Sequence, residues 1–184
     1  MSNGAVTGTV IAGDREDFME YLRPAELRQL PGEIHQTAII GHPPEVRDWR
    51  PGDKCVAPMV HKTARIGAYV TIDAGTVRST TIGARALVLK KVHVGHDAVI
   101  GEDCELSTGC IIGGHVTIGD RTRVGLGAVI LPHRTIGKDC VIGANSTVTK
   151  DLPDGSIVAG NPARHIRPNP VRHTERDDQH RRLA

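Results

Sequence analysis

The stretch IGARALVLKKVHVGHDAVIGEDCELSTGCIIGGHVTIGDRTRVGLGAVILPHRTIGKDCVIGANSTV, residues 82–148, repeats itself every six residues. Stepping by six from Ile82 to Val148, twelve consecutive positions hold Val, Ile or Leu, although these types make up only about a quarter of the chain. The next residue is usually glycine, and the residue four places after each aliphatic is usually small, as at Ala98, Cys104 and Cys110. A period this regular indicates a repeat architecture.

Six residues are enough for one short strand and one corner. Three such units close one triangular coil, in which the aliphatic and small positions point inward and strands of successive coils lie about 4.8 Å apart. The pattern predicts an all-β fold, the hexapeptide-repeat parallel β-helix, which is left-handed in known cases. The alternation within each strand excludes an amphipathic helix.

The domain organisation follows from where the repeat is regular. We expect an N-terminal extension at 1–33, a left-handed β-helix domain at 34–153, a C-terminal cap at 154–170 and a mobile tail at 171–184. Apolar residues within 16–30 have helical spacing and predict a short helix. The Pro-rich, charged segment 42–59 predicts a loop, and four extra residues near Thr76–Thr81 predict a bulge.

The composition excludes several classes of protein. Four aromatic residues and 10 leucines, against 34 Val plus Ile (18 plus 16), would leave a helical bundle badly packed. A net charge of +2, without a basic stripe, gives no reason to expect a nucleic-acid partner. No stretch has the ~18 apolar residues of a membrane span, and the N-terminus is unlike a signal peptide, so we expect a cytoplasmic protein. Four cysteines without a CxxC pair predict packing thiols and no metal.

One corner of the predicted helix gathers polar side chains. Because three repeat units make one coil, His96 lies next to Gly114, and Asp97 lies next to His115, with His133 one coil further on. Solvated corner residues are the plain interpretation. The chemical interpretation makes His96 a general base, because an unperturbed imidazole titrates near pH 6.5. Asp97 would orient the imidazole, and the N–H of Gly114 would stabilise an oxyanion, a set that suits acyl transfer.

The motif His93-Val-Gly-His96-Asp97, followed by Gly113-Gly114-His115, resembles the active-site pattern of the UDP-N-acetylglucosamine O-acyltransferases of lipid A synthesis. The likeness covers roughly residues 34 to 167, although a histidine common in that family is Asp73 here. It implies that 34–153 is an acyltransferase domain, with His96 as base, Asp97 as its partner and Gly114 as oxyanion donor. It also implies that the acceptor sugar nucleotide is contacted by His93, His115, Glu45 and Arg47.

The ending IGANSTVTKDLPDGSIVAGNPARHI, residues 142–166, is similar instead to the terminal coil of coenzyme A-dependent sugar O- and N-acetyltransferases. This likeness implies acetyl-CoA or another acyl thioester as co-substrate. The implied cofactor-binding residues are Gly160, Asn161, Pro162, Ala163 and Arg164. The resemblance further implies a homotrimer with active sites between subunits, a sugar-nucleotide acceptor, and an acyl carrier protein as the other donor to consider.

Two other functions compete with acyl transfer. One is a metal-dependent hydratase of the γ-carbonic anhydrase type, which uses three histidine ligands on the same fold. In that family four residues separate the paired histidines, whereas two separate His93 from His96. The other is a non-catalytic trimeric scaffold, which gives no reason for a His-Asp pair stacked against Gly-His. Hydroxyl and amine acceptors both remain open.

Overall fold

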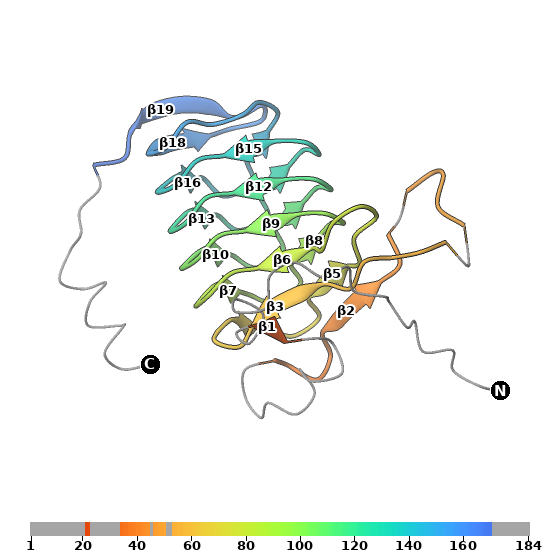
Figure 1. Ribbon diagram of the computed structural model, residues 1–184. Coiled ribbons are helices and arrows are strands. Elements are labelled where there is room, and N and C mark those ends of the chain that lie inside the picture. The colour runs from red at the N-terminus through yellow and green to blue at the C-terminus, as the bar shows by residue number, and fades with distance from the viewer. Residues whose placement is uncertain (1–20, 23–33, 45, 51–52, 171–184) are drawn as a thin grey trace.

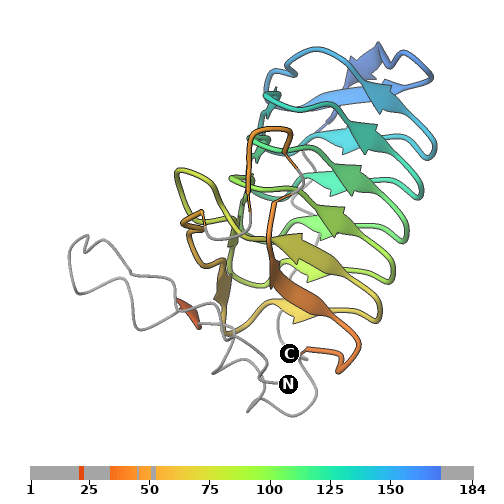
Figure 2. The ribbon, with the colours of Figure 1, turned by 90° about the vertical axis from the view of Figure 1, so that its right-hand side faces the viewer.

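The computed structural model describes residues 21–22, 34–44, 46–50 and 53–170. Short strands follow one another around a triangular column, so that each coil lies on the one before it (Figures 1 and 2). Three sheets form the faces of the column. The all-β parallel solenoid predicted from the six-residue repeat is therefore confirmed.

Each sheet contains every third strand of the repeat, because three strands complete one coil. Sheet A contains β1 (Tyr21–Leu22), β3 (Met59–His61), β6 (Thr81–Ile82), β9 (Val99–Ile100), β12 (Thr117–Ile118) and β15 (Thr135–Ile136). Sheet B contains β4 (Arg65–Ile66), β7 (Leu87–Val88), β10 (Glu105–Leu106), β13 (Arg123–Val124), β16 (Val141–Ile142), β18 (Ser156–Ala159) and β19 (Arg164–Pro168). Sheet C contains β2 (Ile39–His42), β5 (Thr71–Asp73), β8 (His93–Val94), β11 (Ile111–Ile112), β14 (Val129–Ile130) and β17 (Thr147–Val148).

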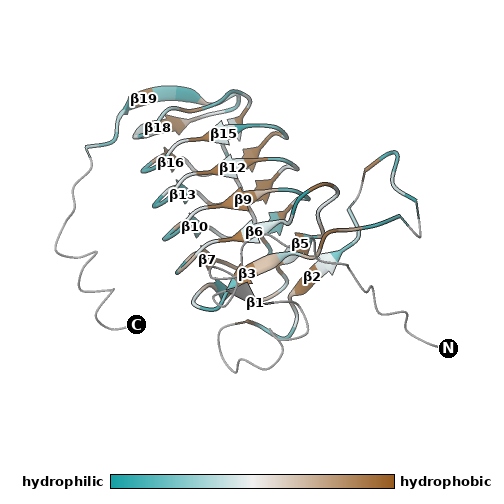
Figure 3. Cartoon of the chain, viewed as in Figure 1, coloured by the Kyte–Doolittle hydropathy of each residue, from teal (hydrophilic) through white to brown (hydrophobic). Residues whose placement is uncertain are grey.

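The repeated aliphatic residues fill the interior of the column. All twelve positions from Ile82 to Val148 are buried, and the brown strands of Figure 3 mark this apolar filling. The small inward positions include Cys104, Cys110 and Cys140, which are buried and free of disulfides, as predicted. Burial raises the pKa of the Cys104 and Cys110 thiols to about 12, so they remain protonated packing groups at neutral pH.

The register between coils shows where the repeat is interrupted. Thr117 pairs with Val99 at the regular interval of three repeat units, whereas the interval between the paired residues His93 and Thr71 is longer by four residues. The four extra residues predicted near Thr76–Thr81 thus leave the column between β5 and β6. Gly75 begins this bulge, where a Cβ atom would overlap the carbonyl group of Arg78.

The two ends of the column are covered in different ways. At the first coil, β1 pairs antiparallel with β3, and at the last coil β19 folds back antiparallel on β18. The helix predicted within 16–30 lies outside the described residues except for Tyr21 and Leu22. These two form a strand because the open edge of β3 offers unpaired backbone groups. Among the described residues, no helix has the length and apolar character needed to cross a bilayer.

Candidate active site

The corner between sheets C and A carries the predicted polar cluster. Asp97, His115 and His133 occupy the same place in three successive coils, and each has a φ of 59° or 60°. The backbone repeats with them, since His115 N–H donates to the carbonyl of His96, and His133 N–H donates to that of Gly114. The sequence placed these residues at one corner correctly.

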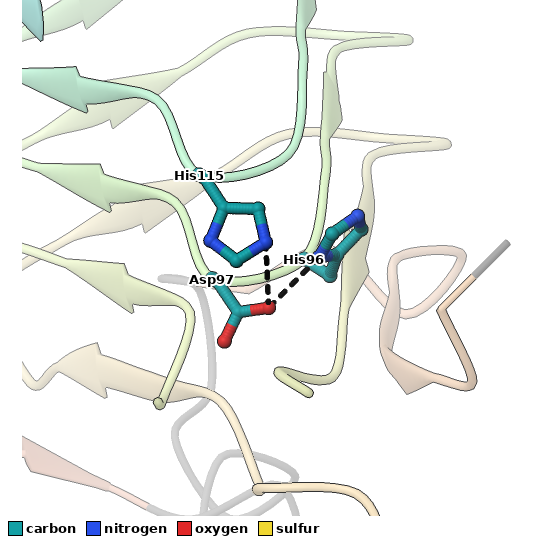
Figure 4. Close-up of side chains that lie close together, drawn as sticks. All are labelled: His96, Asp97 and His115. Atoms are coloured by element: carbon teal, nitrogen blue, oxygen red, sulfur yellow. Dashed lines mark hydrogen bonds and ion pairs between the residues drawn. The ribbon is translucent and has the colours of Figure 1, made fainter. Parts of the chain in front are cut away.

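His96 and Asp97 form a hydrogen-bonded pair (Figure 4). The Nδ1 of His96 lies 2.8 Å from Oδ2 of Asp97, whose side chain is fully buried. An ionised carboxylate only accepts hydrogen bonds. Nδ1 of His96 therefore carries the proton and donates a hydrogen bond to Asp97. The lone pair of the neutral imidazole is therefore on Nε2, which is the arrangement a general base needs.

The bulge between β5 and β6 holds the Asp97 carboxylate. Its oxygens accept hydrogen bonds from the backbone N–H groups of Thr76, Val77 and Arg78 at 2.7 to 3.1 Å, and from Oγ1 of Thr76 at 2.6 Å. The Nε of Arg78 also donates to the carbonyl of Asp97. Sequence analysis located the bulge and gave it no role. Its only sequence signal was the four-residue interruption.

These hydrogen bonds decide the charge of Asp97. Burial raises the pKa of this carboxyl group, but the hydrogen bonds from Thr76, Arg78, His96 and Val77 outweigh it and hold the pKa well below its usual range. Asp97 is therefore a fixed negative charge beside the imidazole, and it stabilises the imidazolium that forms when His96 takes a proton.

Gly114 lies directly against the His96 ring. A Cβ atom at this position would overlap Nε2, Cε1 and Cδ2 of His96, so no larger residue fits while the imidazole keeps its place. No hydrogen bond from the Gly114 N–H to another described residue is present. The Cα of Gly114 thus lies next to the His96 ring, one full coil further along the column, as the repeat predicted.

A cleft opens over this corner. Its volume is about 360 Å³. The lining residues are Val46, Arg47, Asp48, Trp49, Asp53, Lys54, Thr76, His96 and His115. The segment after β2 therefore returns over the corner, and a backbone bridge between Val56 and Gly75 attaches it to the bulge. The resemblance assigns acceptor contacts to Glu45 and Arg47 of this loop, and Arg47 does line the cleft.

Two further histidines extend the corner. The rings of His96 and His115 meet edge to face with centroids 4.9 Å apart, and His115 stacks on His133 at 4.6 Å and an interplanar angle of 9°. The Nε2 of His115 lies 3.7 Å from Oδ2 of Asp97. A dashed line in Figure 4 marks this contact. Burial lowers the pKa of His115. The negative charge of Asp97 acts in the opposite direction and raises this pKa, whereas the charges of His96, His133 and Arg78 lower it further.

Of the other predicted acceptor contacts, His93 does not line the cleft. His93 is on β8, where its Nδ1 lies 2.8 Å from Oγ1 of Thr71 and its Nε2 lies 3.8 Å from Oδ2 of Asp73. Arg47 lines the cleft, whereas Glu45 is outside the described residues.

The predicted cofactor residues occupy another corner. Gly160 and Ala163 bond to the backbone of Thr147 on β17, and Gly160 N–H also bonds to Ser146. Asn161 and Pro162 lie between them in the turn after β18, and Arg164 begins β19. This turn is at the corner between sheets B and C, nearly four coils beyond His96, or roughly 18 Å along the axis. Within one chain, sheet C separates it from the cleft.

A metal ion is a poor fit to the corner. One ligand atom each of His96, Asp97 and His115 lie within 4.8 Å of one another. However, both Asp97 oxygens already accept several hydrogen bonds from the bulge, so this carboxylate has little capacity left for a metal ion. A zinc site needs deprotonated ligands with free lone pairs, so this donor set suits a proton-transfer dyad better.

The lowered pKa of Asp97 predicts a pH-dependent stability. Because the folded pKa lies below the unfolded value of about 4, the charged carboxylate stabilises the fold above that pH and ceases to do so as the pH falls toward the folded pKa. Asp97→Asn should therefore have a lower free energy of unfolding than wild type at pH 7, and the gap should narrow below pH ~4. Urea unfolding across this range measures it; a constant gap would contradict the assignment.

Known proteins share the six-residue repeat of this chain. The family model for bacterial transferase hexapeptide (six repeats) matches residues 79–114 and 115–150. The chain is 53% identical over 106 residues to the acyl-[acyl-carrier-protein]–UDP-N-acetylglucosamine O-acyltransferase of Azotobacter vinelandii. The matched stretch covers 56% of this chain and 40% of that protein. The chain therefore spans less than half the length of this curated relative.

Solved structures share the fold. The UDP-N-acetylglucosamine O-acyltransferase of Moraxella catarrhalis superposes with a TM-score of 0.72 at 27% identity, covering 83% of this chain and 57% of that one. Perosamine N-acetyltransferase of Caulobacter crescentus, solved with CoA and GDP-perosamine, superposes with a TM-score of 0.58 at 28% identity. The match covers 73% of this chain and 55% of that one. In sequence and fold the chain is therefore similar to hexapeptide-repeat acyltransferases, among them UDP-N-acetylglucosamine O-acyltransferases.

Proposed function

We propose that this chain is an acyltransferase that moves an acyl group, most simply acetyl, from a thioester to a hydroxyl or amine of a sugar nucleotide or amino sugar. One observation carries the proposal. His96 directs its Nε2 toward Gly114 and lines an open cleft, while its Nδ1 is bonded to a buried carboxylate. Relatives named as acyltransferases of sugar nucleotides and amino sugars support the substrate class.

The chemistry follows from the different roles of the two ring nitrogens of His96. Nε2 of His96 takes a proton from the acceptor hydroxyl or amine as its oxygen or nitrogen attacks the thioester carbonyl. The carbonyl oxygen becomes an oxyanion that the N–H of Gly114 stabilises. When the C–S bond breaks, the imidazolium returns its proton to the leaving thiolate. Asp97 keeps the ring in the required tautomer and offsets its positive charge throughout.

We propose acetyl-CoA as the donor, with an acyl carrier protein thioester as the alternative. The likeness to the CoA-bound perosamine N-acetyltransferase favours coenzyme A, whereas the Azotobacter vinelandii relative is named for acyl carrier protein. Arg47 and His115 would contact the acceptor across the cleft. We also propose a cytoplasmic reaction, and His93, Glu45, and Gly160 to Arg164 remain predicted substrate or cofactor contacts.

A homotrimer would bring the separated parts together. Sheet C exposes apolar side chains on its outward face, where Ile39 and Ile111 are 52% and 45% exposed. The row of outward positions along this sheet contains no Lys, Arg, Asp or Glu. Sheet B instead presents Arg65, Glu105 and Arg123. We propose that sheet C faces a second copy, so that the Gly160 turn of one copy approaches the His96 corner of another.

The trimer makes a direct prediction. Ile111→Glu should convert a species of three times 19.7 kDa into monomers, because it adds an unpaired charge to an outward row that holds no acidic or basic residue of its own apart from His93. Val141→Glu, at the outward position of β16 on sheet B, should leave the assembly unchanged. Light scattering coupled to size exclusion measures both masses. A wild-type monomer, or two variants of equal mass, would contradict the proposed interface.

The activity is tested by following thioester cleavage. Purified chain is incubated with acetyl-CoA and a panel of UDP- and GDP-linked sugars with free hydroxyl or amino groups, and the released thiol and the acylated product are both quantified. We expect acceptor-dependent release with product mass increased by one acetyl group. Binding of stoichiometric zinc with bicarbonate-forming activity would favour the metal hydratase, and no turnover with either donor class would favour the scaffold.

A further inference from the structure

The corner contains a histidine to which the reaction above gives no task. His133 is exposed, yet its ring lies parallel to that of His115 at a centroid distance of 4.6 Å. The stacking follows from the coil geometry, since both residues occupy the same corner position with φ near 60° and so project their side chains alike. Neither the repeat pattern nor the fold requires histidine at this position.

The Asp97 carboxylate has two imidazoles competing for one oxygen. Oδ2 lies 2.8 Å from Nδ1 of His96 and 3.7 Å from Nε2 of His115. A cationic His115 would attract this oxygen and draw it from His96, which needs it to hold the tautomer that leaves Nε2 basic. The site therefore works best when His115 stays neutral and its ring stays in place.

We propose that His133 is a positioning residue that holds the His115 ring by stacking and opposes its protonation, so that Asp97 remains the partner of His96. The catalytic part of this inference rests on the proposed acyl transfer. The part that concerns His115 rests on the ring geometry, because a second imidazole 4.6 Å away disfavours a positive charge on His115.

The surroundings are consistent with this role. The charged and titratable groups that face His115 are Asp97, His96, His133 and Arg78 on the corner and bulge, and Arg47, Asp48, Asp53 and Lys54 across the cleft. Asp97 favours the charged form of His115, whereas burial, His96, His133 and Arg78 disfavour it. Beyond His133, Arg134 and Asp151 form an ion pair at 3.5 Å and so neutralise one another.

Three chains test the proposal: wild type, His133→Phe and His133→Ala. Phenylalanine keeps a flat ring for stacking but has no titratable nitrogen, whereas alanine has neither the ring nor the nitrogens. Ring signals of His115, assigned with His115→Gln, are titrated by NMR, and those of His165 on β19 serve as the internal reference. Acceptor KM and kcat are measured on the same preparations.

We expect the pKa of His115 to rise by about half a pH unit in both variants, the size expected for two charges at this distance in a largely aqueous setting. We expect the acceptor KM to rise about five-fold or more in His133→Ala and to be largely restored in His133→Phe. An unchanged His115 titration in both variants would overturn the proposal. If wild type transfers no acyl group, the proposed function fails, and the titration still decides the role of His133.

Discussion

His96→Asn is expected to lower kcat for acyl transfer by about 10² to 10⁴-fold, the usual contribution of a general base. Asparagine can keep a hydrogen bond to Asp97 but has no basic nitrogen to place beside Gly114. The loss should appear in kcat with little change in acceptor KM, because proton transfer belongs to the transition state. Steady-state kinetics with acetyl-CoA and the acceptor identified by the panel measure both quantities.

The matched control for this variant is His35→Asn. His35 is exposed on the first coil, where its Nδ1 contacts Thr37, and it does not line the cleft. We expect wild-type kinetics from it and an unchanged melting temperature from both variants. Turnover by His96→Asn within about three-fold of wild type would remove His96 as the base and leave the chemistry to another group.

Gly114→Ala is expected to reduce kcat by about 10²-fold although it adds only one methyl group. The new Cβ would overlap the His96 ring, so the imidazole must turn away from the amide beside it, and displacements of about 1 Å have effects of this size. The residue has no positive φ, so the backbone itself tolerates alanine. The melting temperature should also fall, because the buried corner is overpacked.

The double variant His96→Ala/Gly114→Ala separates steric from general effects. Without the imidazole the methyl group has room, so the second substitution should cost much less stability than it does in the wild-type background. Thermal melts of the two single variants and the double variant give the coupling. If the changes in melting temperature of the two single variants simply add in the double variant, Gly114 and His96 are not in contact. That result would contradict the geometry of the site.

The fold was predictable because the sequence repeats what the structure repeats. A strand pairs with its counterpart in the next coil, so the aliphatic ladder from Ile82 to Val148 determined the sheets, the inward faces and the corner shared by His96 and Gly114. No long-range information was needed, since every contact between regular coils has the same sequence separation. The buried thiols of Cys104 and Cys110 followed from the same periodicity.

The surroundings of the corner were less predictable because they lie outside the repeat. The Thr76–Arg78 segment binds Asp97 through backbone N–H groups, which any residue can supply and which therefore leave no sequence signature. The loop residues Arg47 and Lys54 reach the cleft through a chain path that no period describes. The stacking of His133 on His115 could be located from the spacing, but its ring geometry could not.

The central claim is that one site unites the basic nitrogen of His96 with the amide of Gly114. A crystal structure of the chain with a non-hydrolysable acyl-thioester analogue and the acceptor tests this most directly. The account predicts the acyl carbonyl oxygen at hydrogen-bond distance from the Gly114 nitrogen and the acceptor hydroxyl or amine at Nε2 of His96. Acyl and acceptor groups bound at a different corner of the column, with His96 facing only solvent, would contradict it.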